Sequence, residues 1–292
     1  MAPHDPGAAP AAGPEPSYLI GQVTAPALHV MSWNIRRPVP AVLARPADRW
    51  GGRAPRLRAL LAAERPTLLG AQEVLGDQAA VVREALGAGY DLVGRGRGAD
   101  GGGEASPIFY DSGRLELLDW DQAALSDQPT RAGSVSWGNI FPRVMVSATF
   151  RDRVTSRRFL VVNTHLDPFS ARSRLRSARA IGDLVSAAGM PAVVTGDLNT
   201  GPSGAAVREL VRDGTLADSW YSARTRVSEE WGTYADYRAP RRNGSRIDWI
   251  LASSAFRVTH AAVNPLRHGG GWASDHLPVQ AVMELDEGGS GT

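Results

Sequence analysis

The stretch WASDHLPVQ, residues 272–280, places two costly polar side chains directly before an apolar alternation. Asp275 and His276 stand side by side, and Leu277 and Val279 then alternate with other residues, as in a strand with one buried face. Burying an unpaired carboxylate is expensive, so a buried position here requires partners for both side chains. The rest of the sequence therefore has to supply those partners.

The composition is that of a globular chain with one large domain or two small ones. Of its 292 residues, 43% are hydrophobic, which is enough for a sizeable core. All 32 basic residues are arginine, but the formal net charge is only +2. The chain as a whole is therefore not expected to attract polyanions strongly. Cysteine is absent, which excludes disulfides, thiolate metal sites and a cysteine nucleophile.

The two ends of the chain differ from its body. Residues 1–16 are rich in Pro, Ala and Gly, and residues 286–292 are similarly biased, so we predict disordered tails around one domain over 28–285. The first 30 residues lack the basic and apolar regions of a signal peptide. No run of about 18 apolar residues predicts a membrane span, so we expect a cytoplasmic monomer.

The body alternates strand and helix patterns. Predicted strands occupy 28–35, 67–74, 191–199, 246–253, 256–263 and 278–285, with predicted hairpins over 106–120 and 144–166. Helical periodicity occupies 56–66, 77–87 and 171–189, the last capped by Ser170. The Gly-rich stretch 94–106 lacks the frame of a nucleotide-binding loop and is interpreted as a surface loop. This pattern predicts a mixed α/β fold with two packed sheets.

Most of these strands end in polar residues that a core does not need. They are Asn34, Glu73, the group Asn163, His165 and Asp167, the pair Asp197 and Asn199, Asp248, and the pair Asp275 and His276. Each has an ordinary explanation when taken alone, such as a hydrogen-bonded core histidine or a surface ion pair. Carboxylates that converge in one place require a cation, a proton or hydrogen-bond donors. Their joint occurrence at strand ends therefore predicts a site.

Seven short stretches, taken in order, resemble the endonuclease/exonuclease/phosphatase family. They are MSWNIR (31–36), AQEV (71–74), PIFYD (107–111), VVNTHLD (161–167), TGDLN (195–199), RIDWIL (246–251) and SDHLPV (274–279). Each piece is a weak signal, but seven in order are specific. The resemblance implies a DNase I-like fold, which is a four-layer α/β sandwich of two packed mixed β-sheets flanked by helices. The residues of these motifs are similar to those of the compact bacterial branch of the family.

The resemblance also implies hydrolysis of phosphate esters with a divalent metal ion. Glu73 is then expected to bind the ion, with Asn34 and Asp275 at the edge of the same site. Oxygen ligands of this kind suit Mg²⁺, or Mn²⁺, better than zinc. Arg36 and Arg143 are expected to hold the phosphate or a substituent of the substrate.

The family's proton chemistry is carried over onto two pairs of residues. Asp197 is expected to orient or deprotonate the attacking water, with Asn199 bound to the same water or to the developing phosphorane. His276 is expected to pair with Asp248, because a carboxylate beside an imidazole fixes its tautomer. Asp275 would then face the metal while its neighbour His276 faces the substrate, since adjacent extended residues point opposite ways.

Two further side chains are candidates for stabilising the charge of the transition state. His165 is expected to donate to a non-bridging phosphate oxygen. Tyr110 either assists there or is a core aromatic, and the sequence leaves both interpretations open.

The substrate is open between three classes. The first is a small or medium phosphorylated molecule such as a sugar phosphate, phospholipid head group or nucleotide. The second is DNA or RNA, which is less favoured because YRAPRRNGSR (237–246) is the one dense basic stretch and QEVL (72–75) departs from the spelling of abasic-site endonucleases. The third is a non-catalytic binding module, which is disfavoured because no expected catalytic side chain is missing.

Overall fold

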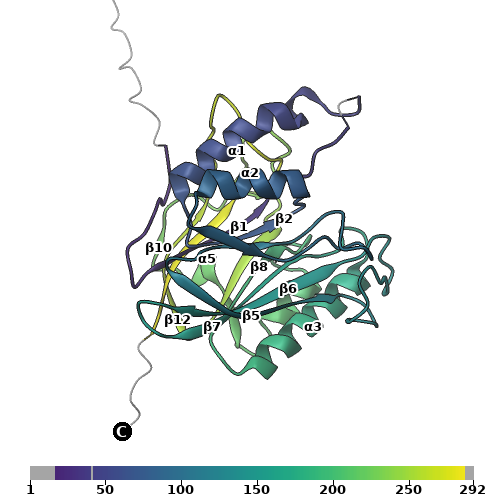
Figure 1. The fold of residues 1–292 in the computed structure, drawn as a ribbon, viewed down its shortest axis with the longest axis vertical. Coiled ribbons are helices and arrows are strands. Elements are labelled where there is room, and N and C mark those ends of the chain that lie inside the picture. Colours follow the sequence, from purple (N-terminus) through teal and green to yellow (C-terminus); the bar gives the residue numbers. More distant parts are fainter. Residues whose placement is uncertain (1–16, 41, 287–292) are drawn as a thin grey trace, which may run out of the picture.

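The computed structural model describes residues 17–40 and 42–286, so the tails predicted at 1–16 and 287–292 lie outside the described residues. Its elements form four layers, with helices α1 and α2 on one outer face, α3 on the other, and two β-sheets between them (Figure 1). No helix in the described part of the chain is long and apolar enough to cross a membrane.

Helices and strands follow one another along the whole described chain. The helices are η1 (Pro46–Asp48), α1 (Trp50–Glu64), α2 (Gly76–Leu86), α3 (Ala171–Ala188), α4 (Ala205–Leu210) and α5 (Ser219–Ser222). The strands are β1 (Leu28–Asn34), β2 (Leu68–Gln72), β3 (Tyr90–Val93), β4 (Ile108–Asp111), β5 (Leu115–Ala124), β6 (Val144–Asp152), β7 (Arg158–His165), β8 (Ala192–Asp197), β9 (Leu216–Asp218), β10 (Thr225–Arg226), β11 (Asp248–Ser253), β12 (Phe256–Val263) and β13 (Val279–Leu285). As predicted, Ser170 caps α3 by accepting a hydrogen bond from the Ser173 N–H.

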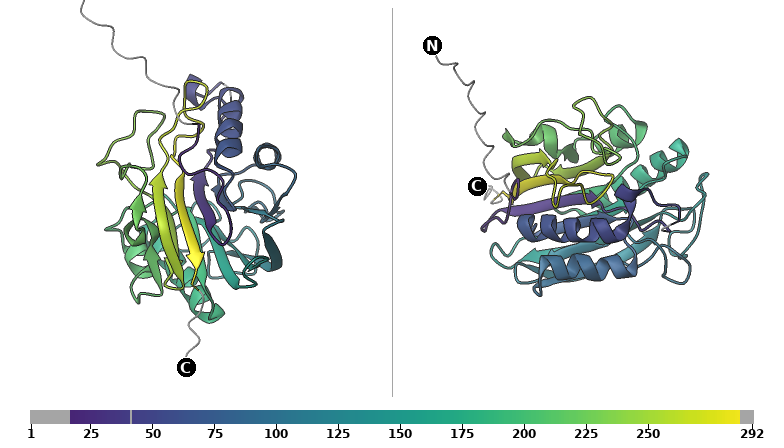
Figure 2. Two further views of the ribbon diagram at one scale, coloured as in Figure 1. Left: turned by 90° about the vertical axis from the view of Figure 1, so that its left-hand side faces the viewer. Right: turned by 90° about the horizontal axis from the view of Figure 1, so that it is seen from above.

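Both sheets are mixed, as predicted. The seven-stranded sheet has the order β10-β12-β13-β1-β2-β4-β3, and the six-stranded sheet has the order β5-β6-β7-β8-β11-β9. Each has a parallel pair at its centre, β1 with β2 and β7 with β8, flanked by antiparallel neighbours. Figure 2 shows β12 and β13, from the end of the chain, beside β1 from its beginning.

Three apolar clusters hold the layers together. The inner faces of the two sheets meet in one buried cluster, which includes Leu68, Phe150 and Met283. A second packs α3 and α4 on the six-stranded sheet, and a third packs α1 and α2 on the seven-stranded sheet. Burial of this kind contributes about 25 cal/mol for each Å² of apolar surface removed from water.

The predicted hairpin over 106–120 is wrong. The chain does turn at Ser112-Gly113, where Asp111 Oδ1 accepts the Gly113 N–H, but β4 and β5 join different sheets. Strand β4 is almost fully buried and pairs with β2 and β3, whereas β5 is a half-exposed edge strand that pairs with β6. Turn chemistry alone cannot distinguish a hairpin from a crossing between sheets.

The first helix is longer than its pattern predicts. It begins at Trp50 rather than at residue 56 and passes through Pro55. The added turn contains Arg53, whose buried guanidinium bonds to carbonyl groups of other segments, so tertiary contacts outweigh the weak local propensity. Strand β3 and the short elements α4, β9, α5 and β10 were not predicted.

Asn163 connects the two sheets rather than lining the site. Its Oδ1 accepts hydrogen bonds from Gln72 Nε2 at 2.8 Å and Thr195 Oγ1 at 3.0 Å, and its Nδ2 donates to three carbonyl groups, of Ala71, Ser106 and Pro107. Gly70 makes this approach possible, because a Cβ there would lie 2.1 Å from Thr195 Oγ1.

Candidate active site

The parallel pairs bring the predicted residues to one end of the sandwich. In the register of the six-stranded sheet, Asp197 lies beside His165 on one side and Asp248 on the other. Asn34 ends β1 in the other sheet, and its Nδ2 donates to Asp197 Oδ2 at 3.1 Å and to Glu73 Oε1 at 3.0 Å. Asn34 therefore joins the two halves of the site, at the carboxyl ends of the central strands where α/β proteins commonly bind ligands.

Three residues at these strand ends have left-handed backbone. Arg36, Glu73 and Asn199 have φ values of 58°, 60° and 49°, and each follows a central strand within two residues. This conformation disfavours a side chain by about 1–2 kcal/mol, least for Asn. The turns therefore store strain at the site, as is common where function fixes a conformation.

Asp197 lies between two imidazole rings. Its Oδ2 is 3.5 Å from His165 Nε2 and 3.8 Å from His276 Nε2. The other nitrogen of His276, Nδ1, is 2.8 Å from Asp248 Oδ2, the pairing that the sequence predicts. The backbone of this segment is fixed by Trp33, whose Nε1 donates to the His276 carbonyl at 3.0 Å.

The buried charges of this group shift one another's titration. Burial opposes a charged His276 ring, but Asp248 and Asp197 outweigh it and raise the pKa of His276 to about 10. Burial and the adjacent Asp248 raise the pKa of Asp197 to about 7. Burial and the Arg143 charge hold the pKa of His165 well below its usual value, so its ring is neutral at pH 7. A carboxyl group with a pKa near the working pH is suited to proton transfer.

Asn199 and Asp167 position the site rather than face its centre. The Asn199 N–H donates to Asp197 Oδ1 at 2.9 Å, and its Nδ2 donates to the Leu166 carbonyl at 2.9 Å. Asp167 Oδ1 accepts the N–H groups of Phe169 and Ser170, which starts the turn into α3. Asn199 thus holds Asp197 through its backbone, and its contact with the attacking water or the phosphorane stays a prediction.

Arg36 lies among three carboxylates. Its guanidinium is 3.3 Å from Asp48 Oδ2, 3.7 Å from Glu73 Oε2 and 3.6 Å from Asp275 Oδ2. Burial disfavours charge on Glu73, but the hydrogen bonds from Asn34 and the Arg37 N–H and the Arg36 charge keep its pKa at about 2. Glu73 is therefore ionised, and a contact of Arg36 with the substrate stays a prediction.

The donor set of this acidic group fits a hard divalent cation. Glu73, Asp275 and Asp48 converge on one cationic position, with oxygen donors of the kind that Mg²⁺ and Mn²⁺ prefer. A second set also qualifies, since one donor atom each of Asp197, Asp248 and His276 lie within 4.8 Å of one another. In that set the His276 ring already bonds to Asp248 Oδ2, whereas Asp248 Oδ1 has no hydrogen-bond partner among the described residues.

Tyr110 does not belong to the site. It lies in the apolar cluster between the sheets, with its ring centroid 4.9 Å from that of Phe150. In register it faces Leu68 at the start of β2, whereas the site lies at the end of that strand. The strand's two-residue period buries this ring, so the core interpretation holds and the catalytic one is corrected.

A narrow cleft, too tight to hold a water molecule, lies beside His165. The Arg97–Arg143 cleft, as we call it, is lined mainly by Glu73, Arg97, Glu104, Ser106, Arg143 and His165. Arg97 and Glu104 come from the Gly-rich stretch 94–106, which was interpreted as a plain surface loop and instead forms one wall of the site. Their ion pair, at 2.9 Å, holds the loop in place.

Arg53 supports the site without lining it, and its role was missed from sequence. This fully buried guanidinium donates to backbone carbonyl groups of three segments, at Asp48, Ile35, Arg36, Arg37 and Ala273. It thereby fixes the turn after β1 and the segment before Asp275. Arg53 precedes the helical pattern predicted over 56–66, so the sequence gives no signal for this role.

The loop before β11 covers the His276 side of the site. Thr233 Oγ1 accepts the Asp248 N–H, and the Leu277 N–H donates to the Thr233 carbonyl. The adjacent Tyr234 is 47% exposed, and its ring lies edge-on to His276 with centroids 5.1 Å apart. An exposed aromatic ring thus stands at the mouth of the site.

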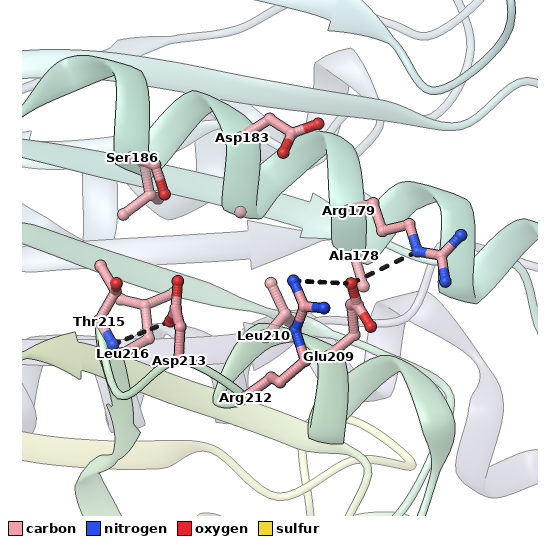
Figure 3. Close-up of a pocket in the computed structure, with 12 residues that line it drawn as sticks. Ala178, Arg179, Asp183, Ser186, Glu209, Leu210, Arg212, Asp213, Thr215 and Leu216 are labelled. Atoms are coloured by element: carbon pink, nitrogen blue, oxygen red, sulfur yellow. Dashed lines mark hydrogen bonds and ion pairs between the residues drawn. The ribbon is translucent and has the colours of Figure 1, made fainter.

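A separate pocket between α3 and α4 shows no such convergence (Figure 3). Its charged groups already pair with one another, since Glu209 Oε1 lies 3.4 Å from Arg179 Nε and 3.6 Å from Arg212 Nη2. The pocket lies on the outer face of the six-stranded sheet, away from the strand-end group.

The profile of the Endonuclease/Exonuclease/phosphatase family matches residues 31–276. No curated protein matches the chain.

Two similar structures come from Bacteroides thetaiotaomicron. One is a protein of this family, 29% identical, with a TM-score of 0.82 over 89% of this chain and 98% of its own. The other is a mannosyl-6-phosphatase, 28% identical, with a TM-score of 0.82 over 88% of this chain and 100% of its own. The human Nocturnin catalytic domain is 19% identical, with a TM-score of 0.66 over 89% of this chain and 94% of its own, which supports the fold alone.

Proposed function

Because the chain belongs to the endonuclease/exonuclease/phosphatase family, we propose that it is a divalent-metal-dependent hydrolase that acts on a small or medium phosphorylated substrate. The observation that carries this proposal is the position of Asp197 Oδ2 between the Nε2 atoms of His165 and His276, next to the acidic group around Glu73. The similarity to a mannosyl-6-phosphatase supports a substrate of this size.

Asp197 is the base of the proposed reaction. With its pKa raised to about 7, its carboxylate is basic enough to accept a proton from an attacking water and is still half ionised at neutral pH. The Asn199 N–H binds Oδ1, while Oδ2 accepts from Asn34 Nδ2 and faces both histidines, so Oδ2 is the oxygen proposed for this task. Asn199 is accordingly a positioning residue.

The two histidines stabilise charge on the phosphate. His276 is protonated at neutral pH and held by Asp248, so its Nε2 presents a positive N–H to a developing oxyanion. His165 is neutral and donates from its own ring at a second oxygen. Neither ring has to move, because both are buried in position.

Glu73 and Asp275 are the proposed metal ligands, with Asn34 holding Glu73 in place. A bound Mg²⁺ or Mn²⁺ ion would supply Lewis-acid polarisation of the phosphate and its leaving group. Arg36 supplies the neighbouring positive charge that keeps these carboxylates together.

The basic stretch 237–246 gives little support to a polynucleotide substrate. Three of its four arginines pair with acidic neighbours, among them Arg242 with Glu229 at 2.9 Å and Arg246 with Asp218 at 2.6 Å. Arginines that are already paired neutralise fewer phosphates and so release fewer counterions from a nucleic acid. The release of counterions dominates nucleic-acid affinity, so that affinity is expected to be weak.

The test is hydrolysis of simple phosphate esters with Mg²⁺, Mn²⁺ or EDTA. Metal-dependent turnover is expected, with a loss of about 10²- to 10⁴-fold in His276→Ala and none in the matched control His260→Ala. His260 is exposed on β12 and bonds only to its neighbour Thr259. Turnover that survives EDTA, or that is equal in the two variants, would refute the proposal.

A further inference from the structure

Tyr234 lies at the border between the buried site and solvent. It is 47% exposed, whereas His276 beside it is 6% exposed and Asp197 is 1% exposed. The ring centroids of Tyr234 and His276 are 5.1 Å apart and their planes are inclined at 62°, so the two rings are not stacked face to face. A substrate that reaches His276 from this side therefore passes the Tyr234 ring.

The cleft on the His165 side offers no room for the organic group of a substrate. The Arg97–Arg143 cleft is too tight to hold a water molecule, and Arg97 in its wall pairs with Glu104 at 2.9 Å. Arg143, which also lines it, has its Nε atom 3.5 Å from Asp167 Oδ2. The organic group attached to a reacting phosphate is therefore directed toward the His276 side, where Tyr234 is exposed.

Backbone contacts fix the segment that carries this ring. The N–H groups of Ala235 and Asp236 both donate to the Asp275 carbonyl, at 2.9 and 3.0 Å. Tyr234 itself forms an isolated β-bridge with His276. Because the segment is held by the strand-end residues themselves, binding against the ring costs little ordering of the chain.

Hydrogen-bonding groups adjoin the ring. Asp236, two residues further on, binds the exposed Arg45 through both carboxylate oxygens. Burial, and then the negative charges of Asp275 and Asp236, raise the pKa of Tyr234, so its hydroxyl keeps its proton at pH 7 and can donate a hydrogen bond. An aromatic ring beside a few such groups suits a ligand that has both an apolar face and several hydroxyl groups.

We propose that Tyr234 binds the organic group of the substrate, and that this group is a sugar whose phosphate reacts at Asp197 and His276. The inference rests on the proposed function and specifies its substrate class. The C–H groups of a sugar ring can pack on the face of the phenol ring, while the sugar hydroxyl groups can bond to Asp236 and Arg45. A short alkyl group offers neither contact. Tyr234 is thus a specificity-determining residue.

Hydrolysis of two esters of primary alcohols measures this preference. The metal-loaded parent and Tyr234→Ala are compared on mannose 6-phosphate and ethyl phosphate. We expect the ratio of their kcat/KM values, mannose 6-phosphate over ethyl phosphate, to fall about 5- to 20-fold in Tyr234→Ala, mainly through KM, and to be largely kept in Tyr234→Phe. Tyr221→Ala is the control, because Tyr221 is an exposed ring on α5 whose hydroxyl contacts Glu230.

A purely structural role of Tyr234 would give a different result. If the ring only held His276 in place, Tyr234→Ala would lower kcat for both esters by the same factor and leave the ratio unchanged. That result would overturn the inference.

Binding without turnover separates failure of this inference from failure of the proposed function. Metal-loaded Asp197→Asn, which lacks the proposed base, is titrated by calorimetry with mannose 6-phosphate, ethyl phosphate and phenyl phosphate, with and without Tyr234→Ala. We expect mannose 6-phosphate to bind about 5- to 20-fold more tightly than ethyl phosphate, and Tyr234→Ala to abolish the difference.

The outcomes of this titration are distinct. Equal affinities for mannose 6-phosphate and ethyl phosphate, or a preference for phenyl phosphate over mannose 6-phosphate that needs Tyr234, would overturn the sugar inference alone. A preference for mannose 6-phosphate that needs Tyr234, together with a parent protein that hydrolyses no phosphate ester, would overturn the proposed function alone.

Discussion

The hydrogen bond from His276 Nδ1 to Asp248 Oδ2 determines which nitrogen of the ring faces Asp197. Asp248→Asn keeps the shape of the side chain. The amide can, however, hold the His276 ring in the wrong tautomer, and it no longer stabilises a positive charge on that ring. We predict a loss of kcat of about 10²- to 10⁴-fold, with an unchanged circular dichroism spectrum. Asp183→Asn, on the surface of α3, serves as control, and parental kcat in Asp248→Asn would contradict the assigned pairing.

The protonation of His276 predicts how the stability of the metal-free protein depends on pH. Since its pKa is raised to about 10 from a usual 6.5, the folded state binds this proton more tightly than the unfolded chain does. The stabilisation is complete below about pH 6.5 and is lost as pH rises through about 10. The melting temperature should therefore fall between these pH values more steeply in the parent than in His276→Gln. Parallel curves in the two proteins would disprove it.

At the scale of the elements, close contact of the sheets depends on β2 having no side chain at Gly70. A Cβ there would meet Thr195 Oγ1 and Asn163 Oδ1, at 2.1 and 2.7 Å. We predict that Gly70→Ala lowers the free energy of unfolding in urea by about 1–3 kcal/mol. Gly182→Ala in α3, where an added Cβ meets nothing within 4 Å, should instead be neutral or stabilising. Equal stability of the two variants would argue against the contact.

Helix α1 carries the support of the site through Arg53. In Arg53→Met the carbonyl acceptors around the turn after β1 lose a fully buried donor. We predict a loss of about 3–5 kcal/mol in the free energy of unfolding, measured in urea. Arg56→Met in the same helix removes one long bond to the Trp272 carbonyl and should change stability by less than about 0.5 kcal/mol. A small change in the free energy of unfolding of Arg53→Met would mean that the turn after β1 and the segment before Asp275 are stable without these hydrogen bonds.

The elements also show what sequence could and could not predict. Strand and helix periodicity located the long elements, and polar residues at strand ends identified Glu73, His165, Asp197, Asp248 and His276 as a group. Sheet membership of β4 and β5 was not predictable, because it depends on which faces are buried rather than on the turn between them. Likewise, the partners of Arg36 and Arg143 come from segments distant in sequence, so their surroundings had to be seen in three dimensions.

For the whole molecule, the acidic group around Glu73 predicts coupling between metal binding and stability. An ion that binds only the folded chain stabilises it by about 2.7 kcal/mol at a concentration 100 times its dissociation constant. Mg²⁺ or Mn²⁺ should therefore raise the melting temperature, EDTA should reverse the rise, and Glu73→Gln should abolish it. An unchanged melting temperature at concentrations that saturate activity would contradict the assigned ligands.

The neighbour relation of β1 and β13 has a consequence for biosynthesis. Strand β1 lies between β2 and β13, with Leu28 opposite Met283, so its second edge stays open until the last strand has left the ribosome. An arrested nascent chain would expose that edge, a template for unwanted strand pairing. Asp275 and His276 directly precede β13, so the same final segment completes both the sheet and the site. A chain that is released before this segment is synthesised therefore lacks Asp275 and His276, and its site is incomplete.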